Sequence, residues 1–220
     1  MRPFFYLANA TMKFLLLTLS NWHVEGKENV PRTGPLIVVA NHMSLADPPL
    51  LGASVPRKVT FMAKEELFRG RFSRFVMEGY GGFPVRRGQL DRQGWRHAFE
   101  TLQNGGALAV FPEGSRNPDA TLQPPQPGVS HLAARSGAPL LPVGIAGTEQ
   151  VRGLGFILKR PRITVTIGRP FSLPGVSGKP SRSALDQDSR LIMEHIAELL
   201  PERYRGPYAS RADTGGAHGN

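Results

Sequence analysis

The sequence of 220 residues contains no cysteine. A thiol nucleophile, a cysteine-bound metal and a disulfide scaffold are therefore excluded, and the absence suits a reducing compartment. The sequence also lacks the uninterrupted run of roughly 20 apolar residues that a spanning helix needs, because Asn9 and Lys13 break the apolar stretch 4–19. No small-x-small cleavage site follows before Trp22, which argues against a signal peptide. An interfacial membrane helix fits residues 1–22 better, and the alternative is a helix packed on its own domain.

Acidic residues are scarce, with 17 Asp and Glu against 27 Lys and Arg and a formal net charge of +10. This balance predicts attraction to an anionic partner such as nucleic acid, an anionic lipid surface or a phosphorylated substrate. Few aromatic residues interleave with the basic ones and no zinc-finger spacing occurs, so we expect no nucleic-acid partner. The midchain cations form either a face for an anionic membrane surface or a solvated basic face, and they are Arg57, Lys58, Lys64, Arg69, Arg71, Arg74, Arg86, Arg87, Arg92 and Arg96.

Short apolar segments alternate with longer amphipathic ones from residue 24 onward. We expect strands at 36–40, 59–63, 83–85, 107–111, 140–146 and 162–167. We expect helices over 68–78, 92–103, 128–136 and 184–200, and one opening at Pro48. This order predicts an α/β fold with a mostly parallel central sheet flanked by helices. The predicted domain spans 23–205, and the tail 206–220, rich in small and polar residues, is expected to be disordered.

A histidine and an aspartate follow the buried run Leu36–Ala40 in the sequence Asn-His-Met-Ser-Leu-Ala-Asp. Pro48 suits the first position of a helix, which makes Asp47 the expected N-cap. The loop can then fold back and bring the Asp47 carboxylate against the His42 imidazole. Such a carboxylate would fix the tautomer and stabilise the imidazolium formed when the other ring nitrogen takes a proton. The alternative is a purely structural pair, a buried histidine beside a helix cap.

Three further motifs carry groups suited to binding an anion or a polyol. Residues 81–88 read Gly-Gly-Phe-Pro-Val-Arg-Arg-Gly, in which the guanidinium forks of Arg86 and Arg87 match phosphate oxygens. Phe-Pro-Glu-Gly-Ser-Arg follows another expected strand, so Glu113 is placed to hold hydroxyls and Arg116 to meet phosphate. The stretch Leu-Pro-Val-Gly-Ile from residue 141 is apolar and is expected to shape the site.

These four motifs, in this order, resemble the glycerophosphate acyltransferase family, in particular bacterial 1-acylglycerol-3-phosphate acyltransferases. The resemblance spans roughly residues 22–170. It implies that His42 is a general base, that Asp47 orients it, and that an N-terminal helical segment docks on the membrane. The substrate-binding residues that it implies are Arg87, Glu113, Gly114 and Arg116, and we also expect Arg86 and Ser115 of the same motifs to bind substrate.

The implied reaction moves a fatty acyl group from acyl-CoA or acyl carrier protein to the hydroxyl of 1-acylglycerol-3-phosphate, giving phosphatidic acid. The thioester is already activated, so we expect no metal or other cofactor, and the histidines show no metal-ligand spacing. The enzyme is expected at the cytoplasmic face of the cell membrane, as a peripheral or monotopic protein. Two rivals are a hydrolase using Ser44 or Ser115 and a non-enzymatic module that binds anionic membrane lipids.

One departure from the family pattern concerns the acceptor. Many members carry a lysine just before the helix that follows the third motif, whereas this chain reads Gln-Pro-Pro-Gln-Pro-Gly from residue 123. A cation expected beside the acceptor phosphate is therefore absent from that position. Either Arg86 replaces it, or the acceptor is a different lysophospholipid or hydroxylated lipid.

Overall fold

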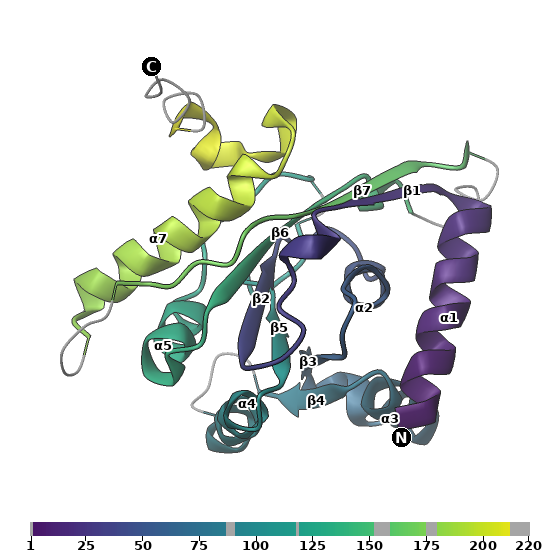
Figure 1. The fold of residues 1–220 in the computed structure, drawn as a ribbon, viewed down its shortest axis with the longest axis horizontal. Coiled ribbons are helices and arrows are strands. Elements are labelled where there is room, and N and C mark those ends of the chain that lie inside the picture. Colours follow the sequence, from purple (N-terminus) through teal and green to yellow (C-terminus); the bar gives the residue numbers. More distant parts are fainter. Residues whose placement is uncertain (1, 87–90, 118, 152–158, 175–179, 212–220) are drawn as a thin grey trace.

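The computed structural model describes residues 2–86, 91–117, 119–151, 159–174 and 180–211. Seven strands form one sheet in the order β1-β7-β6-β2-β5-β3-β4 (Figure 1). Their bounds are β1 Asn21–Glu25, β2 Leu36–Ala40, β3 Val59–Lys64, β4 Gly82–Val85, β5 Ala107–Val110, β6 Leu140–Ala146 and β7 Arg162–Ile167. Five neighbouring pairs are parallel and only β6–β7 is antiparallel, which confirms the mostly parallel sheet. Strand β1, which the sequence did not predict, is an edge strand whose side chains are exposed or half-buried.

Helices flank this sheet, as expected from the alternating pattern. In Figure 1, α7 lies above the sheet and α2 and α4 lie below it, while α1 stands at one end beside α2. The bounds are α1 Arg2–Leu19, α2 Asp47–Ser54, α3 Arg71–Gly79, α4 Arg92–Gln103, α5 Gly128–Ser136 and α7 Arg182–Glu198. Asp91 caps α4 by accepting the backbone N–H groups of Gln93 and Gly94. The expected bounds of α4, α5, β6 and β7 agree with those observed.

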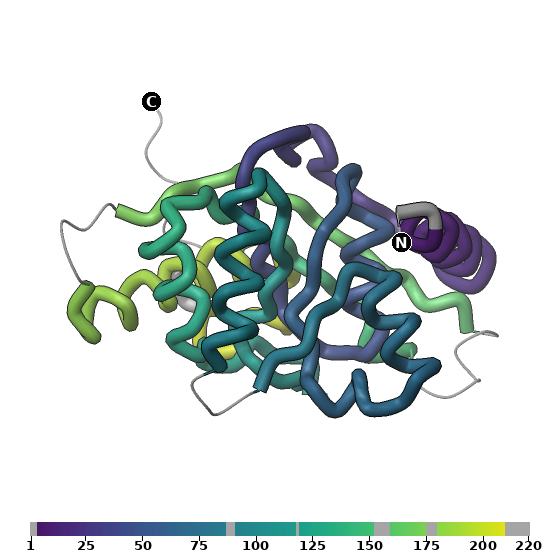
Figure 2. The backbone as a smooth tube through the Cα atoms, turned by 90° about the horizontal axis from the view of Figure 1, so that it is seen from below, coloured from purple at the N-terminus to yellow at the C-terminus, as the bar shows by residue number. Residues whose placement is uncertain are grey.

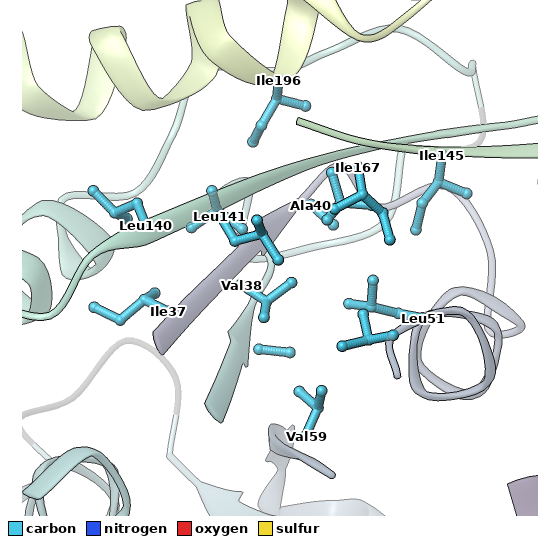
Figure 3. Packing of buried hydrophobic residues seen from close by; sticks show 14 of the residues in the cluster. Ile37, Val38, Ala40, Leu51, Val59, Leu140, Leu141, Ile145, Ile167 and Ile196 are labelled. Carbon is cyan, nitrogen blue, oxygen red and sulfur yellow. The ribbon is translucent and has the colours of Figure 1, made fainter. Parts of the chain in front are cut away.

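The core lies on both faces of the central strands. Every residue of β2 is fully buried, which explains its continuous apolar sequence, since a parallel strand covered on both faces has no polar side. Figure 3 shows Ile196 of α7 on one side of the sheet and Leu51 of α2 on the other. Burying each such side chain stabilises the fold by about 1.5–3 kcal/mol. The strand that leads to the histidine is therefore held by apolar packing on both faces.

Helix α1 is buried on one side only. Phe5 and Leu16 are buried, whereas the large apolar side chains of Tyr6, Leu7 and Phe14 are each more than 60% exposed. Within the described residues, no helix is both long enough and apolar enough to cross a bilayer. The helix therefore packs against its own domain along one face and presents aromatic and aliphatic side chains along the other.

Arg57, which we grouped with the cations facing an anionic partner, instead ties loops together inside the protein. Its guanidinium donates to the carbonyls of Pro31, Gly34 and Gly105, each at 2.9 Å. Burial lowers the pKa of this arginine. These loops precede β2 and β5, so Arg57 joins the entries to the two central strands at the edge away from their carboxyl ends.

The C-terminal segment corrects a second expectation. Residues Gly206–Arg211 form a 3-10 helix, so the predicted disorder from Gly206 is wrong for these residues, and the rest of the predicted tail lies outside the described part. Tyr208 packs against the core, and the preceding Tyr204 is only 2% exposed. The Tyr204 carbonyl accepts the backbone N–H of Leu122 at 2.8 Å. Composition alone missed these two aromatic anchors.

Candidate active site

Four strands deliver their following residues to one edge of the sheet. Strands β6, β2, β5 and β3 are neighbours and run parallel, so their carboxyl ends lie side by side. His42 follows β2, Glu113 and Arg116 follow β5, Lys64 ends β3, and Glu149 follows β6. In open α/β sheets this edge is where ligands bind.

His42 and Asp47 meet as the sequence predicted. The His42 Nδ1 lies 2.9 Å from the Asp47 Oδ2, and both residues are buried. The same Oδ2 accepts the backbone N–H groups of Met43 at 2.6 Å and Ser44 at 2.7 Å. Asp47 is not the N-cap, however: Ala46 takes that place and α2 begins at Asp47. The three donors of the preceding loop hold the carboxylate, so it turns back toward the histidine instead of capping the helix.

Further contacts fix the histidine ring and its backbone. The ring stacks on Phe111, with centroids 4.3 Å apart and planes 24° apart. The neighbouring Asn41 side chain pairs with both the N–H and the carbonyl of Ile145, each at 2.8 Å, which ties this loop to β6. Nδ1 is occupied by Asp47, and Nε2 has no hydrogen-bond partner among the described residues. Nε2 is thus the ring nitrogen left for a substrate.

Glu113 is buried against the backbone of His42. One carboxylate oxygen accepts the backbone N–H of His42 at 2.8 Å, and the other accepts that of Gln123 at 3.0 Å. Burial raises the pKa of Glu113 to about 7, the two amide hydrogen bonds oppose this rise, and the Asp47 charge adds to it. Both oxygens are therefore used within the protein, in contrast to the hydroxyl-binding role that the third motif suggested.

A cavity of about 550 Å³ opens over His42. Ser115 and Arg116 line it, as the sequence predicted for substrate-binding groups, and Lys64 lines it as well. Lys64 is exposed, and its Nζ lies 3.1 Å from the Oε1 of Glu66. The sequence placed Lys64 only on a general basic face, because its closeness to His42 depends on β3 lying next to β5. The cavity therefore contains two cations, from β3 and from the third motif.

The second motif is placed elsewhere. The Arg86 guanidinium pairs with Glu65 at 2.9 Å, and Arg86 lines two other cavities instead of the one that contains His42. Arg87 lies outside the described residues. Gly114, a further predicted binding residue, has a positive φ of 72°, and a Cβ there would come within 2.9 Å of Gln126. Among the described residues, no group of three His, Asp or Glu side chains is placed to hold a metal ion.

With the sheet, the buried histidine–aspartate pair and the cationic cavity described, comparison with known protein families identifies the chain as a transferase. The chain belongs to the Acyltransferase family, whose model matches residues 21–146.

The names of individual relatives describe a reaction more narrowly than the family description does. The chain is 26% identical over 195 residues to a 1-acyl-sn-glycerol-3-phosphate acyltransferase of Bacillus subtilis, covering 88% of this chain and 95% of that protein. It is 34% identical over 113 residues to a lyso-ornithine lipid O-acyltransferase of Pseudomonas aeruginosa, covering 51% of this chain and 43% of that protein. The crystal structure of the 1-acyl-sn-glycerophosphate acyltransferase PlsC from Thermotoga maritima matches with a TM-score of 0.68 and 30% identity, covering 86% of this chain and 76% of that one.

Proposed function

We propose that the protein is a 1-acylglycerol-3-phosphate O-acyltransferase, which transfers a fatty acyl group from an acyl thioester to the free hydroxyl of the lysophospholipid. The observation that carries this proposal is the His42–Asp47 pair, buried beside the cationic cavity, with no hydrogen bond to Nε2 of the imidazole from any residue that the structure describes. The named relatives support both the reaction and the acceptor. Phosphatidic acid and a free thiol are the products.

His42 acts as the general base in this reaction. The Nδ1–H group donates a hydrogen bond to Asp47, so Nε2 is the nitrogen that takes a proton. It takes the proton of the acceptor hydroxyl while the hydroxyl oxygen attacks the thioester carbonyl. The new C–O bond forms, the C–S bond breaks, and the imidazolium returns its proton to the leaving sulfur. General base catalysis of this kind contributes about 10²–10⁴-fold. The reaction forms no covalent enzyme intermediate and requires no cofactor, since the thioester is already activated.

The acceptor phosphate is assigned to Arg116 and Lys64. Both line the cavity that contains His42, and each offers donors to an anion, Arg116 as a planar fork and Lys64 as a point charge. Lys64 thus supplies a cation where the family's usual lysine is missing, a role first considered for Arg86. Glu113 serves as a positioning residue that holds the His42 backbone.

The exposed face of α1 is assigned to the membrane interface. Its aromatic and aliphatic side chains suit the boundary between headgroups and acyl chains, and the positive charge of the chain suits anionic lipids. We place the enzyme at the cytoplasmic face of the membrane, where acyl-CoA or acyl carrier protein supplies the donor.

The mechanism is tested by His42→Ala and Asp47→Ala, assayed for transfer from labelled acyl-CoA to lysophosphatidate. We expect transfer to fall by at least about 10²-fold in the His42 variant with the fold unchanged by circular dichroism. His23→Ala is the matched control, since His23 lies exposed on β1 and, within the described ranges, forms an ion pair with Glu25 alone. Transfer by His42→Ala at the parent rate would refute the mechanism. Replacing Ser44 and Ser115 by alanine should leave transfer in place, whereas a serine hydrolase would lose activity.

The acceptor has a second candidate. The relative from Pseudomonas aeruginosa acts on a lyso-ornithine lipid by name, and Glu149, an acidic residue, lines the His42 cavity together with the two cations. An acceptor with both an anionic and a cationic group is compatible with that lining. Comparing lysophosphatidate with lyso-ornithine lipid in one assay separates the two acceptors by their kcat/KM values.

A further inference from the structure

A second cationic hollow lies away from His42, between helices α4 and α5. The two helices run side by side in Figure 2, and between them is a groove of about 670 Å³. We call this the α4–α5 groove, and it is lined chiefly by Arg92, Trp95, Arg96, Phe99, His131 and Arg135.

The arginines of this groove are available to an anion. Arg92, Arg96 and Arg135 are exposed, and none of them forms an ion pair within the described part of the chain. Glu100 is the one acidic residue among the lining residues. Arg86 and Arg190, by contrast, are each held by a glutamate. The α4–α5 groove therefore carries an uncompensated positive charge.

Aromatic rings lie among these cations. Trp95 meets the edge of His131 with centroids 5.5 Å apart, and the Arg135 guanidinium lies 5.0 Å from the centre of the Phe99 ring. Trp95 and Phe99 are both half-buried, so part of each ring remains accessible. Guanidinium forks recognise phosphate, and aromatic faces stack on nucleobases. This combination fits a phosphorylated nucleoside better than a plain anion.

The groove and the cavity over His42 are both neighbours of a third cavity. Trp95 also lines this third cavity, of about 410 Å³, together with Met62 and Phe111. Ser115 lines the third cavity and also the cavity over His42. Phe111, which stacks on the His42 ring, forms part of the partition. The three cavities thus adjoin one another at Trp95 and at Ser115.

We propose that the α4–α5 groove binds the phosphorylated adenosine end of coenzyme A, and that the pantetheine arm extends from it past Trp95 and Ser115 to bring the thioester to His42. The inference rests on the proposed acyl transfer and names the donor. Acyl carrier protein, the other thioester carrier considered, presents a protein surface instead of a free nucleoside and leaves the half-buried rings of the groove without a partner.

Binding is tested with adenosine 3′,5′-bisphosphate as the probe. A Trp22→Phe variant leaves Trp95 as the single tryptophan, so its fluorescence reports occupancy of the groove. We expect saturable quenching that weakens with salt, and a Kd at least about tenfold higher in Arg96→Glu/Arg135→Glu. Arg32→Glu/Arg182→Glu is the matched control, because it makes the same charge change at exposed sites elsewhere. Equal quenching by inorganic phosphate, or an unchanged Kd in the groove variant, would overturn the proposal.

Steady-state kinetics provide a second test of the proposal. The groove variant should raise the KM for acyl-CoA about tenfold with little change in kcat, and should leave the KM for acyl-pantetheine, which lacks the nucleotide, unchanged. A KM that rises only when acyl carrier protein is the donor would assign the groove to that protein and overturn the proposal. If the parent transfers from no donor, the proposed function fails, while nucleotide binding still decides the role of the groove.

Discussion

The strongest prediction concerns the buried carboxyl group beneath the histidine. Glu113 accepts two backbone N–H groups, and burial raises its pKa to about 7 from an ordinary value of 4.5. The folded protein holds this proton up to about pH 7, whereas the unfolded chain releases it near pH 4.5. The stability gained from this proton is fully present below pH 4.5 and is lost as the pH rises through 7.

The size of the effect follows from these two pKa values. Each pH unit across which only the folded state holds the proton is worth about 1.4 kcal/mol, so the Glu113 contribution to the free energy of unfolding falls by about 2.5 kcal/mol between pH 5 and pH 8. Glu113→Gln removes this dependence, since glutamine does not titrate. Between pH 5 and pH 8 the stability of the variant relative to the parent should therefore rise by about 2.5 kcal/mol.

The same substitution should slow the reaction. A glutamine side chain has one carbonyl oxygen in place of two acceptors, so either His42 or Gln123 loses its partner. We expect kcat to fall by roughly tenfold or more, because a small displacement of a catalytic group costs that much. A variant that gains stability relative to the parent as the pH rises and is yet slower is the signature of a positioning residue.

The assay is urea unfolding followed by circular dichroism at pH 5 and pH 8, with kcat measured at pH 8. Asp91→Asn is the control: hydrogen bonds from Gly94, Arg86 and Gln93 lower the pKa of Asp91 below 3.8, so its contribution is constant between pH 5 and pH 8. If the difference between parent and Glu113→Gln changes by less than about 0.5 kcal/mol between the two pH values, the reasoning is refuted.

Two further predictions concern stability. Gly147→Ala should lower the free energy of unfolding by about 2 kcal/mol or more, because Gly147 has φ of 93° and a Cβ would lie 2.0 Å from the Arg162 carbonyl oxygen. Urea unfolding measures this loss. Gly34→Ala is the control and should cost less, because φ at Gly34 is also positive but the space around it is open. Tyr204→Phe should cost about 1 kcal/mol, because the buried hydroxyl donates to Glu149 at 2.8 Å; a thermal midpoint equal to that of the parent would contradict this.

The sequence predicted those parts of the fold that depend on local pattern. The bounds of α4 and of β6 follow from periodicity and turn residues, and Pro48 marked the start of α2 to within one residue. Strand β1 was missed because it is a short edge strand whose residues carry only a weak alternation of apolar and polar side chains. Strands β2 and β6 also pair with a partner more than a hundred residues away, but their continuous apolar sequences made them predictable.

The candidate site shows the same division. The contact between His42 and Asp47 was predictable because both residues lie in one short loop. Lys64 was not, because its place in the cavity depends on strand order, and neither was the burial of Glu113, which depends on Gln123 folding back beneath the strand ends. Arg86 was expected near the acceptor, but Glu65 draws its guanidinium toward another cavity.

Arg57 has a consequence for how the enzyme exchanges substrates. Its guanidinium binds three carbonyls in the two loops that precede the two middle strands, and lysine, with a single ammonium, could not replace that geometry. Because this edge of the sheet is held, the local opening motions that admit a lipid or release a thiol must be concentrated at the opposite edge. We therefore expect hydrogen exchange to be slowest around residue 57 and fastest in the loops over the histidine.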